Sequence, residues 1–405
     1  MVLWLTFIQQ IFDKINSVIT YNLTAMKKLA VILILLVLAR AGHSQSTNDI
    51  LNVLVQRKLV TREEADSLRA DAALKQQEAD AKRKSFPIVA GKTIQLSGFT
   101  QIRYQNLEEK GKKSGFDIRR ARLDLKGTIS PYFGYRFQPD FAGTSTGAFA
   151  KLLDAYAEVK LVDYFNLTIG QQKVALSYEN QVSDNKYESI DRSQVVEALV
   201  ARSKDVIGNH NGRDIGVQAS GSLFKIGDRP LADYQVGVYN GAGINVSADN
   251  NQSKDVAARV IFHPVAGLDL GGSYYNGVGY YLVNATDKTA RNKGRSRWGT
   301  ELSYEWQNVS IRSEYLQGKD NVITKAGYYV QAAYFLIPQK FQAVVKYDNY
   351  DPDKDVSNNA TTLYTIGLNY NFNANARIQG AYTFKEEQGP KISNNYAVFQ
   401  FQIGF

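Results

Sequence analysis

The chain has 405 residues, with 48 lysines and arginines against 39 aspartates and glutamates, and therefore a formal net charge of +9. It contains no cysteine, which excludes disulfide bonds, thiolate nucleophiles and sulfur-ligated metal sites. A basic balance is typical of proteins that bind nucleic acid, anionic membranes or small anions, and composition does not choose among these partners.

The stretch MKKLAVILILLVLARAGHSQ, residues 26–45, is typical of a secretory signal. Two lysines precede an apolar core from Leu29 to Ala39, which is too short to cross a bilayer as a stable helix. The alternative is an ordinary core helix. We expect residues 1–44 to be an upstream extension plus the signal peptide, with the true start at Met26. Their removal would lower the formal charge to +6, and export argues against a nucleic-acid partner.

Residues 45–85 are expected to form a short helical leader. Apolar residues recur at helical spacing from Ile50 to Leu59, and a second helix begins at the capping box Thr61-Arg62-Glu63-Glu64. After Leu74 the segment is almost entirely polar. It is therefore either a coiled coil that brings chains together or a solvated spacer, and the sequence leaves both open.

Residues 86–405 have the pattern of a transmembrane β-barrel. Segments that alternate apolar with polar residues are joined by short turns in alternation with eight longer polar loops, which predicts sixteen antiparallel strands. The longer loops are 107–115, 142–150, 173–212, 242–253, 280–294, 318–325, 351–360 and 386–393. Each strand must cross about 25 Å of apolar membrane with its backbone paired, so the sheet must close. The fold class is therefore all-β.

Two other architectures are less consistent with this pattern. A soluble β-sandwich also alternates, but its outward face would be polar. An α-helical membrane protein needs a run of about 18 or more apolar residues, and the chain has none. The final strand, YAVFQFQIGF, ends at Phe405 with aromatic residues on one face. This ending is typical of outer-membrane proteins delivered to the barrel assembly machinery, so we expect the bacterial outer membrane as the location and its lipid as a partner.

Arginines lie within the strand FDIRRARLDLKG, residues 116–127. Leu123 and Leu125 set the lipid face, so Arg120 and Arg122 should face the lumen. A charge on the lipid face would cost about 2–4 kcal/mol at the midplane. Arg119 has the opposite parity and must lie at the rim, snorkel or follow a bulge.

The same parity places Arg103 and Arg136 in the lumen beside Arg120 and Arg122. Such a cluster of cations could set ion selectivity at the narrowest point of a pore. The alternative is that these arginines are paired with wall carboxylates and have no role in permeation. The sequence leaves both interpretations open.

The longest loop, residues 173–212, is the candidate constriction. Loops of this length are usually functional or disordered. Val195, Val196, Leu199 and Val200 recur at helical spacing, so part of the loop should pack. Folded into the lumen, the loop would bring five cations toward the pore axis, where arginines could bind an oxyanion bidentately. These cations are Lys173, Lys186, Arg192, Arg202 and Lys204.

The chain resembles the phosphate-selective porin O and P family over roughly residues 90–405. The resemblance rests on FDIRRARLDLKG, YRFQPDF, LLDAYAEVKL, GQQKVALSYE, IDRS, GRDIGVQASG and YQVGVYNGAG, which follow one another in the same order. ILNVLVQRKLVTREEADSL resembles the helical leader of many members. The resemblance implies a sixteen-stranded, trimeric outer-membrane channel, lined by an arginine ladder with lysines at a phosphate-binding constriction.

Some residues match the family's motifs individually. The Arg-Arg pair corresponds to Arg119 and Arg120, the arginine of the GRDIG block to Arg213, and basic positions around the third loop to Lys173 and Arg192. The chain departs from the family in three places, all of which touch the constriction. They are Ala175 where proline is usual, Asp191 where glutamate is usual, and an insertion-like SKDVIGNHN before the GRDIG block.

We therefore predict a porin that passes small anions such as phosphate. The candidate anion-binding and pore-lining residues are Arg103, Arg119, Arg120, Arg122, Arg136, Lys173, Arg192 and Arg213. The alternative is a general diffusion porin with weak anion preference. His210 and His263 lie in no catalytic motif, so no enzyme, cofactor or metal site is expected. An energised transporter would need a plug domain, and an adhesin would conduct no ions.

Overall fold

The computed structural model describes residues 85–89, 92–142, 150–206, 211–227, 229–246, 248–279 and 292–405. All of them belong to one compact unit, Lys84–Phe405. The expected extension and signal peptide lie outside the described residues, and so does the expected helical leader apart from its last residue. No helix in the described part of the chain is long and apolar enough to cross a membrane.

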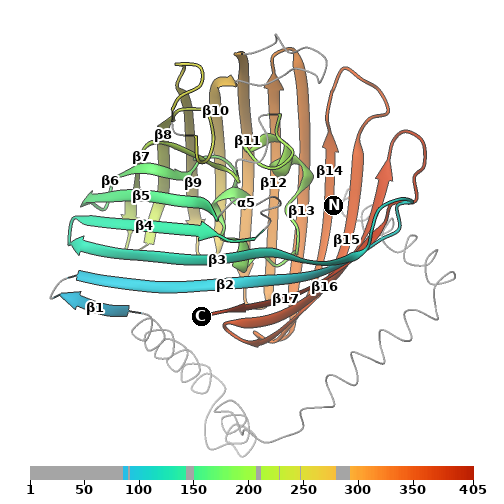
Figure 1. The fold of residues 1–405 in the computed structure, drawn as a ribbon, viewed down its shortest axis with the longest axis horizontal. Coiled ribbons are helices and arrows are strands. Elements are labelled where there is room, and N and C mark those ends of the chain that lie inside the picture. The colour runs from blue at the N-terminus through green and yellow to red at the C-terminus, as the bar shows by residue number, and fades with distance from the viewer. Residues whose placement is uncertain are drawn as a thin grey trace, which may run out of the picture. The chain divides into compact units, whose positions relative to one another are not determined.

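Sixteen antiparallel strands, β2 to β17, form a closed barrel (Figure 1). Each strand pairs with its neighbours in sequence, and β17 pairs with β2 to close the ring. The short strand β1 adds to the start of β2 as a hairpin. The strands are β1 (Ser85–Val89), β2 (Lys92–Leu107), β3 (Gly115–Ser130), β4 (Phe133–Asp140), β5 (Lys151–Val162), β6 (Phe165–Lys173), β7 (Arg213–Ile226), β8 (Arg229–Tyr239), β9 (Asp255–Val265), β10 (Leu268–Gly279), β11 (Lys293–Trp306), β12 (Val309–Asp320), β13 (Ile323–Ile337), β14 (Phe341–Asp351), β15 (Thr361–Asn373), β16 (Ala376–Glu387) and β17 (Tyr396–Gly404). The predicted sixteen-stranded barrel is confirmed.

Side chains alternate between the outer face of the barrel and its lumen. In β9, Val256, Val260 and Phe262 are exposed on the outer face, whereas Asp255 and Arg259 are buried on the inner side. This arrangement is the reverse of a soluble sandwich, whose outer face is polar. The apolar residues therefore face lipid, and the charged residues of the strands face the interior.

One expected loop is not a loop. The sequence predicted a long connection at 318–325, but β12 runs to Asp320 and β13 begins at Ile323, so that two residues form the turn. Asn321 in this turn has a φ of +55°, a left-handed conformation that asparagine tolerates. Lys325 and Arg297 both pair with Asp320, at 2.7 and 2.6 Å. Because these ion pairs neutralise charged side chains that face the lumen, the polar residues at 318–320 and 323–325 can remain in strands β12 and β13.

The connection between β6 and β7, residues 174–212, folds into the barrel and is called the lumen loop below (green in Figure 1). Its described residues form three short helices. They are α5 (Tyr178–Gln181), η1 (Asp184–Lys186) and α6 (Gln194–Leu199). Ser177 and Ser193 cap α5 and α6 with their side-chain oxygens. The loop makes hydrogen bonds to strands on several sides of the lumen, as described below.

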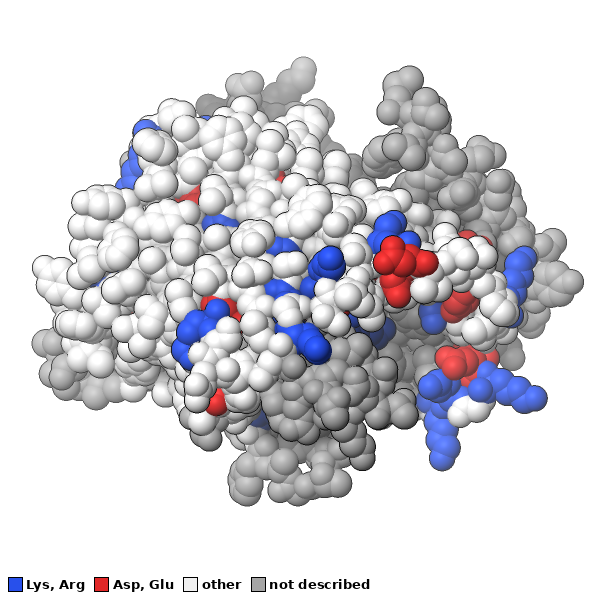
Figure 2. Space-filling view, turned by 90° about the horizontal axis from the view of Figure 1, so that it is seen from above, with Lys and Arg blue, Asp and Glu red and all other residues white. Residues whose placement is uncertain are grey.

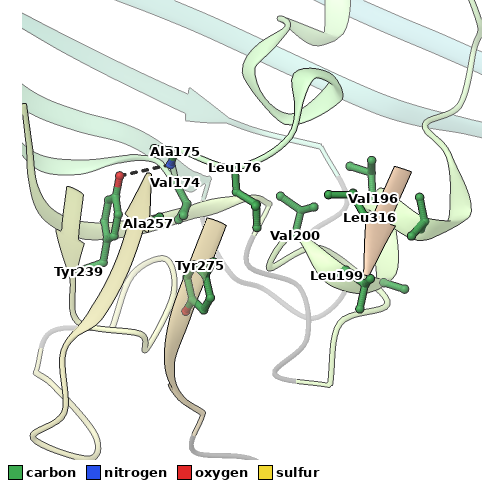
Figure 3. Packing of buried hydrophobic residues seen from close by; sticks show 12 residues of the cluster. Val174, Ala175, Leu176, Val196, Leu199, Val200, Tyr239, Ala257, Tyr275 and Leu316 are labelled. Atoms are coloured by element: carbon green, nitrogen blue, oxygen red, sulfur yellow. Dashed lines mark hydrogen bonds between the residues drawn. The ribbon is translucent and has the colours of Figure 1, made fainter. Parts of the chain in front are cut away.

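A hydrophobic cluster fixes the lumen loop against one wall of the barrel (Figure 3). The loop contributes Val174, Ala175, Leu176, Val195, Val196, Ala198, Leu199 and Val200, and the wall contributes Tyr239, Ala257, Tyr275 and Leu316. The backbone N–H of Ala175 also donates to the Tyr239 hydroxyl at 3.2 Å. The expected packing of the apolar residues in α6 is confirmed, since Val195 and Val196 are fully buried.

Candidate anion site in the barrel lumen

Four of the predicted arginines lie together on adjacent strands inside the barrel. Arg103 belongs to β2, Arg120 and Arg122 to β3, and Arg136 to β4. The first three are almost completely buried, each 6–7% exposed. The inward parity expected for these residues agrees with their burial. Among the described residues on the face seen in Figure 2, most are uncharged, and the charged side chains lie in scattered groups, some basic only and some mixed.

A β-bulge accounts for Arg119. In the β2–β3 ladder Arg120 pairs with Gln101 and Ile118 pairs with Ile102, so that Arg119 is the extra residue of the bulge. Ile118 stays on the outer face, where it is 56% exposed. Arg119 therefore departs from the inward–outward alternation of its neighbours because the bulge interrupts that alternation in β3.

Arg119 acts electrostatically on the lumen loop. Burial raises the pKa of the Glu197 carboxyl, but Arg202, Arg192 and Arg119 together outweigh this and lower the pKa to about 2. Arg202 is the direct partner, with its Nε 3.3 Å from Oε1 of Glu197. Arg119 is thus one of the smaller contributors to the lowered pKa of Glu197.

Asp184 of η1 is the centre of the strongest charge cluster. Its Oδ1 forms ion pairs with Arg120, whose Nη2 lies 3.0 Å away, and with Arg192, and its Oδ2 accepts a hydrogen bond from Arg122. Burial opposes ionisation of this carboxyl, which is 3% exposed, yet the arginines hold its pKa well below the usual range. The carboxylate of the loop is therefore ionised and surrounded by guanidinium groups from both the wall and the loop.

Arg103 and Arg122 also have carboxylate partners on the barrel wall. Arg103 forms a bidentate pair with Asp117, at 3.0 and 2.6 Å, and its Nη1 lies 3.5 Å from Asp191. Arg122 donates from Nε to Asp140 at 2.7 Å. Neither guanidinium group lacks an acceptor.

Arg136 and Arg213 share one carboxylate. Asp154 lies 3.1 Å from Nη1 of Arg136 and 2.6 Å from Nε of Arg213. Arg136 also pairs with Asp124 in bidentate geometry, at 2.8 Å for both bonds. Lys173 donates instead to backbone carbonyls of the lumen loop, those of Gln181 and Val182, at 2.9 Å each.

The eight predicted residues therefore divide into two groups. Seven are engaged: Arg103, Arg120, Arg122, Arg136, Arg192 and Arg213 pair with carboxylates, and Lys173 binds loop carbonyls. Arg119 is exposed and forms no ion pair with another described residue. Within β3 and the described residues of the lumen loop, Lys126, Lys186 and Lys204 share these two properties.

The opposite side of the lumen is organised differently. Glu314 of β12 accepts from the backbone N–H groups of Tyr178 and Glu179, both at 2.8 Å, and from the Tyr329 hydroxyl at 2.9 Å. Asp348 of β14 accepts from the backbone N–H of Gln194 at 2.8 Å. These wall carboxylates hold the first turns of α5 and α6.

A third set of contacts joins the loop to strands from β12 to β17. Glu188 accepts from Ser310, from Gln331 at 2.8 Å and from Gln342 at 3.1 Å. Gln402 of β17 donates to the carbonyl of Asn185 at 3.2 Å. The lumen loop is thus fixed along much of the inner wall.

Sequence analysis did not identify Asp184 or Glu314 as organising residues. Glu314 was recognisable only as one of several inward-facing acids. Asp184 lies in the polar run VSDNKYES, which carries no strand or helix periodicity that could indicate its direction. Among the described residues, no group of three or more histidine, aspartate or glutamate side chains could hold a metal ion.

Comparison with known proteins agrees with this architecture. A family model described as Phosphate-selective porin O and P matches residues 94–403. An uncharacterized protein of Aquifex aeolicus (strain VF5) is 22% identical, over 94% of this chain and 99% of that protein.

Several solved structures share the fold. The loop L8 deletion mutant of OmpT of Vibrio cholerae is 14% identical with a TM-score of 0.59, covering 78% of this chain and 100% of its own. OmpF of Salmonella typhi, solved with daunomycin, is 13% identical with a TM-score of 0.58, covering 78% and 98%. The outer membrane channel DcaP of Acinetobacter baumannii is 14% identical with a TM-score of 0.57, covering 79% and 99%.

Proposed function

The chain belongs to the phosphate-selective porin O and P family, and on this premise we propose that it is an outer-membrane porin through which small anions, phosphate among them, diffuse passively. The family and the barrel fold indicate a channel rather than an enzyme. Arg103, Arg119, Arg120, Arg122, Arg136, Lys173, Arg192 and Arg213 are the proposed pore-lining, anion-binding residues.

One observation carries the anion preference. Arg119, Lys126, Lys186 and Lys204 are exposed and form no ion pair with a described residue, while the buried cations around them are neutralised. A mobile anion can approach an exposed cation without first displacing a carboxylate. Local excess charge of this kind determines which ions enter a pore.

A general diffusion porin with weak anion preference is the second candidate. It is favoured by the carboxylate pairing of Arg103, Arg120, Arg122 and Arg136. Paired arginines contribute little net charge to the pore, because each positive charge has a negative one within about 3 Å. The two candidates differ only in how much excess positive charge a passing ion meets.

Assembly and targeting complete the proposal. OmpT of Vibrio cholerae has been solved in a trimer form, and it shares this fold. We infer that this chain also forms a homotrimer, inserted by the barrel assembly machinery after removal of residues 1–44. Its terminal strand β17, which closes the barrel, ends one residue before Phe405.

The decisive experiment is the zero-current potential of the purified protein in a planar bilayer across a KCl gradient, repeated after phosphate is added. A potential of the sign for anion preference, with chloride current reduced by phosphate, supports the phosphate-binding porin. A potential near zero without a phosphate effect would contradict it and favour the general diffusion porin.

A further inference from the structure

Three guanidinium groups converge on the carboxylate of Asp184. Arg120 and Arg122 come from β3, and Arg192 comes from the lumen loop. Arg120 is positioned by a second bond, from its Nη1 to the Gln101 side chain at 2.7 Å. The ring of Tyr187 lies 4.6 Å from the centre of the Arg192 guanidinium. The arginines are therefore oriented by neighbours other than the carboxylate.

This cluster contains more positive than negative side chains. Asp184 and Asp140 are the carboxylates that contact the three arginines, and Asp140 contacts Arg122 alone. If the Asp184 carboxylate were absent, Arg122 would keep an anionic partner. Arg120 and Arg192 form no ion pair with any other described carboxylate, although Glu197 and Glu179 act on Arg192 electrostatically. Two buried guanidinium groups would then have lost their ion-pair partner.

We propose that Asp184 is a built-in anionic occupant of an oxyanion site formed by Arg120, Arg122 and Arg192, and that phosphate must compete with it for this site. The proposal rests on the porin function proposed above and identifies a residue that determines its specificity. Planar guanidinium groups present paired N–H donors that match the oxygens of carboxylate and phosphate alike. A carboxylate and a tetrahedral oxyanion therefore compete for the same donors.

The location of Asp184 makes it a removable occupant. It belongs to η1, a three-residue turn of the lumen loop, and not to a barrel strand. The loop is held independently by its hydrophobic cluster and by Glu314 and Asp348 on the other side of the lumen. Removing the Asp184 side chain should therefore leave the loop in place and free the donors.

The test compares two substitutions on the same loop. Asp184→Ala removes the occupant and opens space, and Asp184→Asn removes its charge at nearly constant volume. Asp191→Ala is the matched control. It deletes an equal charge from the same loop, but its partner Arg103 keeps the bidentate pair with Asp117. The measurement is the concentration of inorganic phosphate that halves the chloride current through single channels.

We expect Asp184→Ala to lower the half-blocking phosphate concentration at least about tenfold relative to Asp191→Ala, the effect of roughly one charge-assisted hydrogen bond. Equal values for folded Asp184→Ala and Asp191→Ala would overturn the proposal. If Asp184→Ala does not assemble, Asp184→Asn decides. Phosphate should raise its melting temperature more than that of Asp191→Ala, and an equal rise would overturn the proposal.

The two proposals can fail separately. Ion preference of the unmodified protein tests the porin function, whereas the difference between Asp184→Ala and Asp191→Ala tests the role of Asp184. The unmodified channel could prove cation-preferring or unselective, while phosphate blocks only the Asp184→Ala variant. This result would contradict the first proposal and support the second. An anion-selective channel whose phosphate block is unaffected by Asp184→Ala would do the opposite.

Discussion

The lumen loop is held by two walls of opposite chemistry. On the β2–β4 side the wall supplies cations, Arg120 and Arg122, and the loop supplies the carboxylate of Asp184. On the β12–β14 side the wall supplies the carboxylates of Glu314 and Asp348, and the loop supplies backbone N–H groups. We propose that a soluble anion can take the place of the loop carboxylate in the first contact, since a carboxylate and a soluble oxyanion use the same guanidinium donors. The second contact cannot be exchanged in this way, because its donors belong to the loop itself.

We infer from this difference that one wall anchors the lumen loop and that the other wall sets the ion selectivity of the pore. Leu316 of β12 belongs to the hydrophobic cluster, and α6 packs on β12, β13 and β14, so we infer that this wall anchors the loop. The β2–β4 wall carries most of the arginines predicted to line the pore. We therefore expect changes at the β12–β14 wall to alter channel size and changes at the β2–β4 wall to alter ion preference.

The largest effect is expected from Glu314→Ala. It leaves the N–H groups of Tyr178 and Glu179 and the Tyr329 hydroxyl without this acceptor, and each buried unsatisfied donor costs about 1–3 kcal/mol. The loop should detach from the β12–β14 wall, so that single-channel conductance rises and fluctuates. Proteolysis of the intact barrel should cut within 174–212.

Glu305→Ala is the control for this change. Glu305 is also an inward-facing glutamate of the same side, on β11, but it is largely exposed and pairs only with Arg312 among the described residues. Its removal should leave conductance and loop cleavage close to those of the unmodified protein. If the two variants behave alike, the β12–β14 wall does not anchor the loop.

Acid should next weaken ion pairs made by the carboxylates of the lumen loop. The pKa of Glu197 is lowered from its usual 4.5 to about 2, and the pKa of Asp184 is also lowered. A carboxyl with a lowered folded-state pKa contributes stability that is present above its unfolded value and is lost as the pH falls through the folded value. The ion pairs of Asp184 with Arg192 and of Glu197 with Arg202 should therefore persist at pH 4.5, and the Glu197 pair should weaken toward pH 2. Pepsin cleavage of the loop, followed across this interval, measures the transition; cleavage that is already complete at pH 4.5 contradicts it.

An intermediate effect is expected from replacing Arg119 and Arg120 together by alanine. A full charge about 4 Å from a passing ion in a water-like environment is worth about 1 kcal/mol, or about fivefold in partitioning. The ratio of anion to cation permeability should fall by about that factor, and the barrel should stay folded because Asp184 keeps Arg122 and Arg192. The zero-current potential measures the ratio.

Lys225→Ala provides the comparison for the arginine pair. Lys225 is a half-exposed cation near the β7–β8 turn that pairs with Asp163. Its loss should leave the potential unchanged. A folded Arg119/Arg120 variant with the potential of Lys225→Ala would show that the bulge arginines do not act on the pore.

The barrel could be predicted from sequence because its physics is local. Within a strand such as β9, the alternation of apolar and polar residues indicates which side chains face lipid. The alternation of short and long connections indicates which strand ends lie at each membrane face. The error at 318–325 has the opposite cause. The polar residues there predict a loop, whereas in the structure Asp320 and Lys325 pair across the β12–β13 ladder.

The site was only partly predictable. Parity placed Arg103, Arg120 and Arg122 inside, and the bulge at Arg119 was one of three outcomes that parity allowed. The pairing of these arginines depends on where a forty-residue loop returns within the lumen. Neither periodicity nor spacing encodes that position, so the role of Asp184 emerged only from its contacts.

The smallest effects are expected from the exposed lysines of the lumen loop, and they can locate the path of the ions. Lys186 adjoins the part of the loop that contacts Gln101 and Gln402, whereas Lys204 follows α6, which packs on β12, β13 and β14. Replacing either by glutamine should change the permeability ratio by less than about twofold, since a flexible exposed charge is screened by water and salt. If anions pass along the arginine wall, Lys186→Gln should lower anion preference and Lys204→Gln should not. The reverse order would place the path on the side of the loop where α6 packs, and would assign selectivity to the wall that we identify as the anchor.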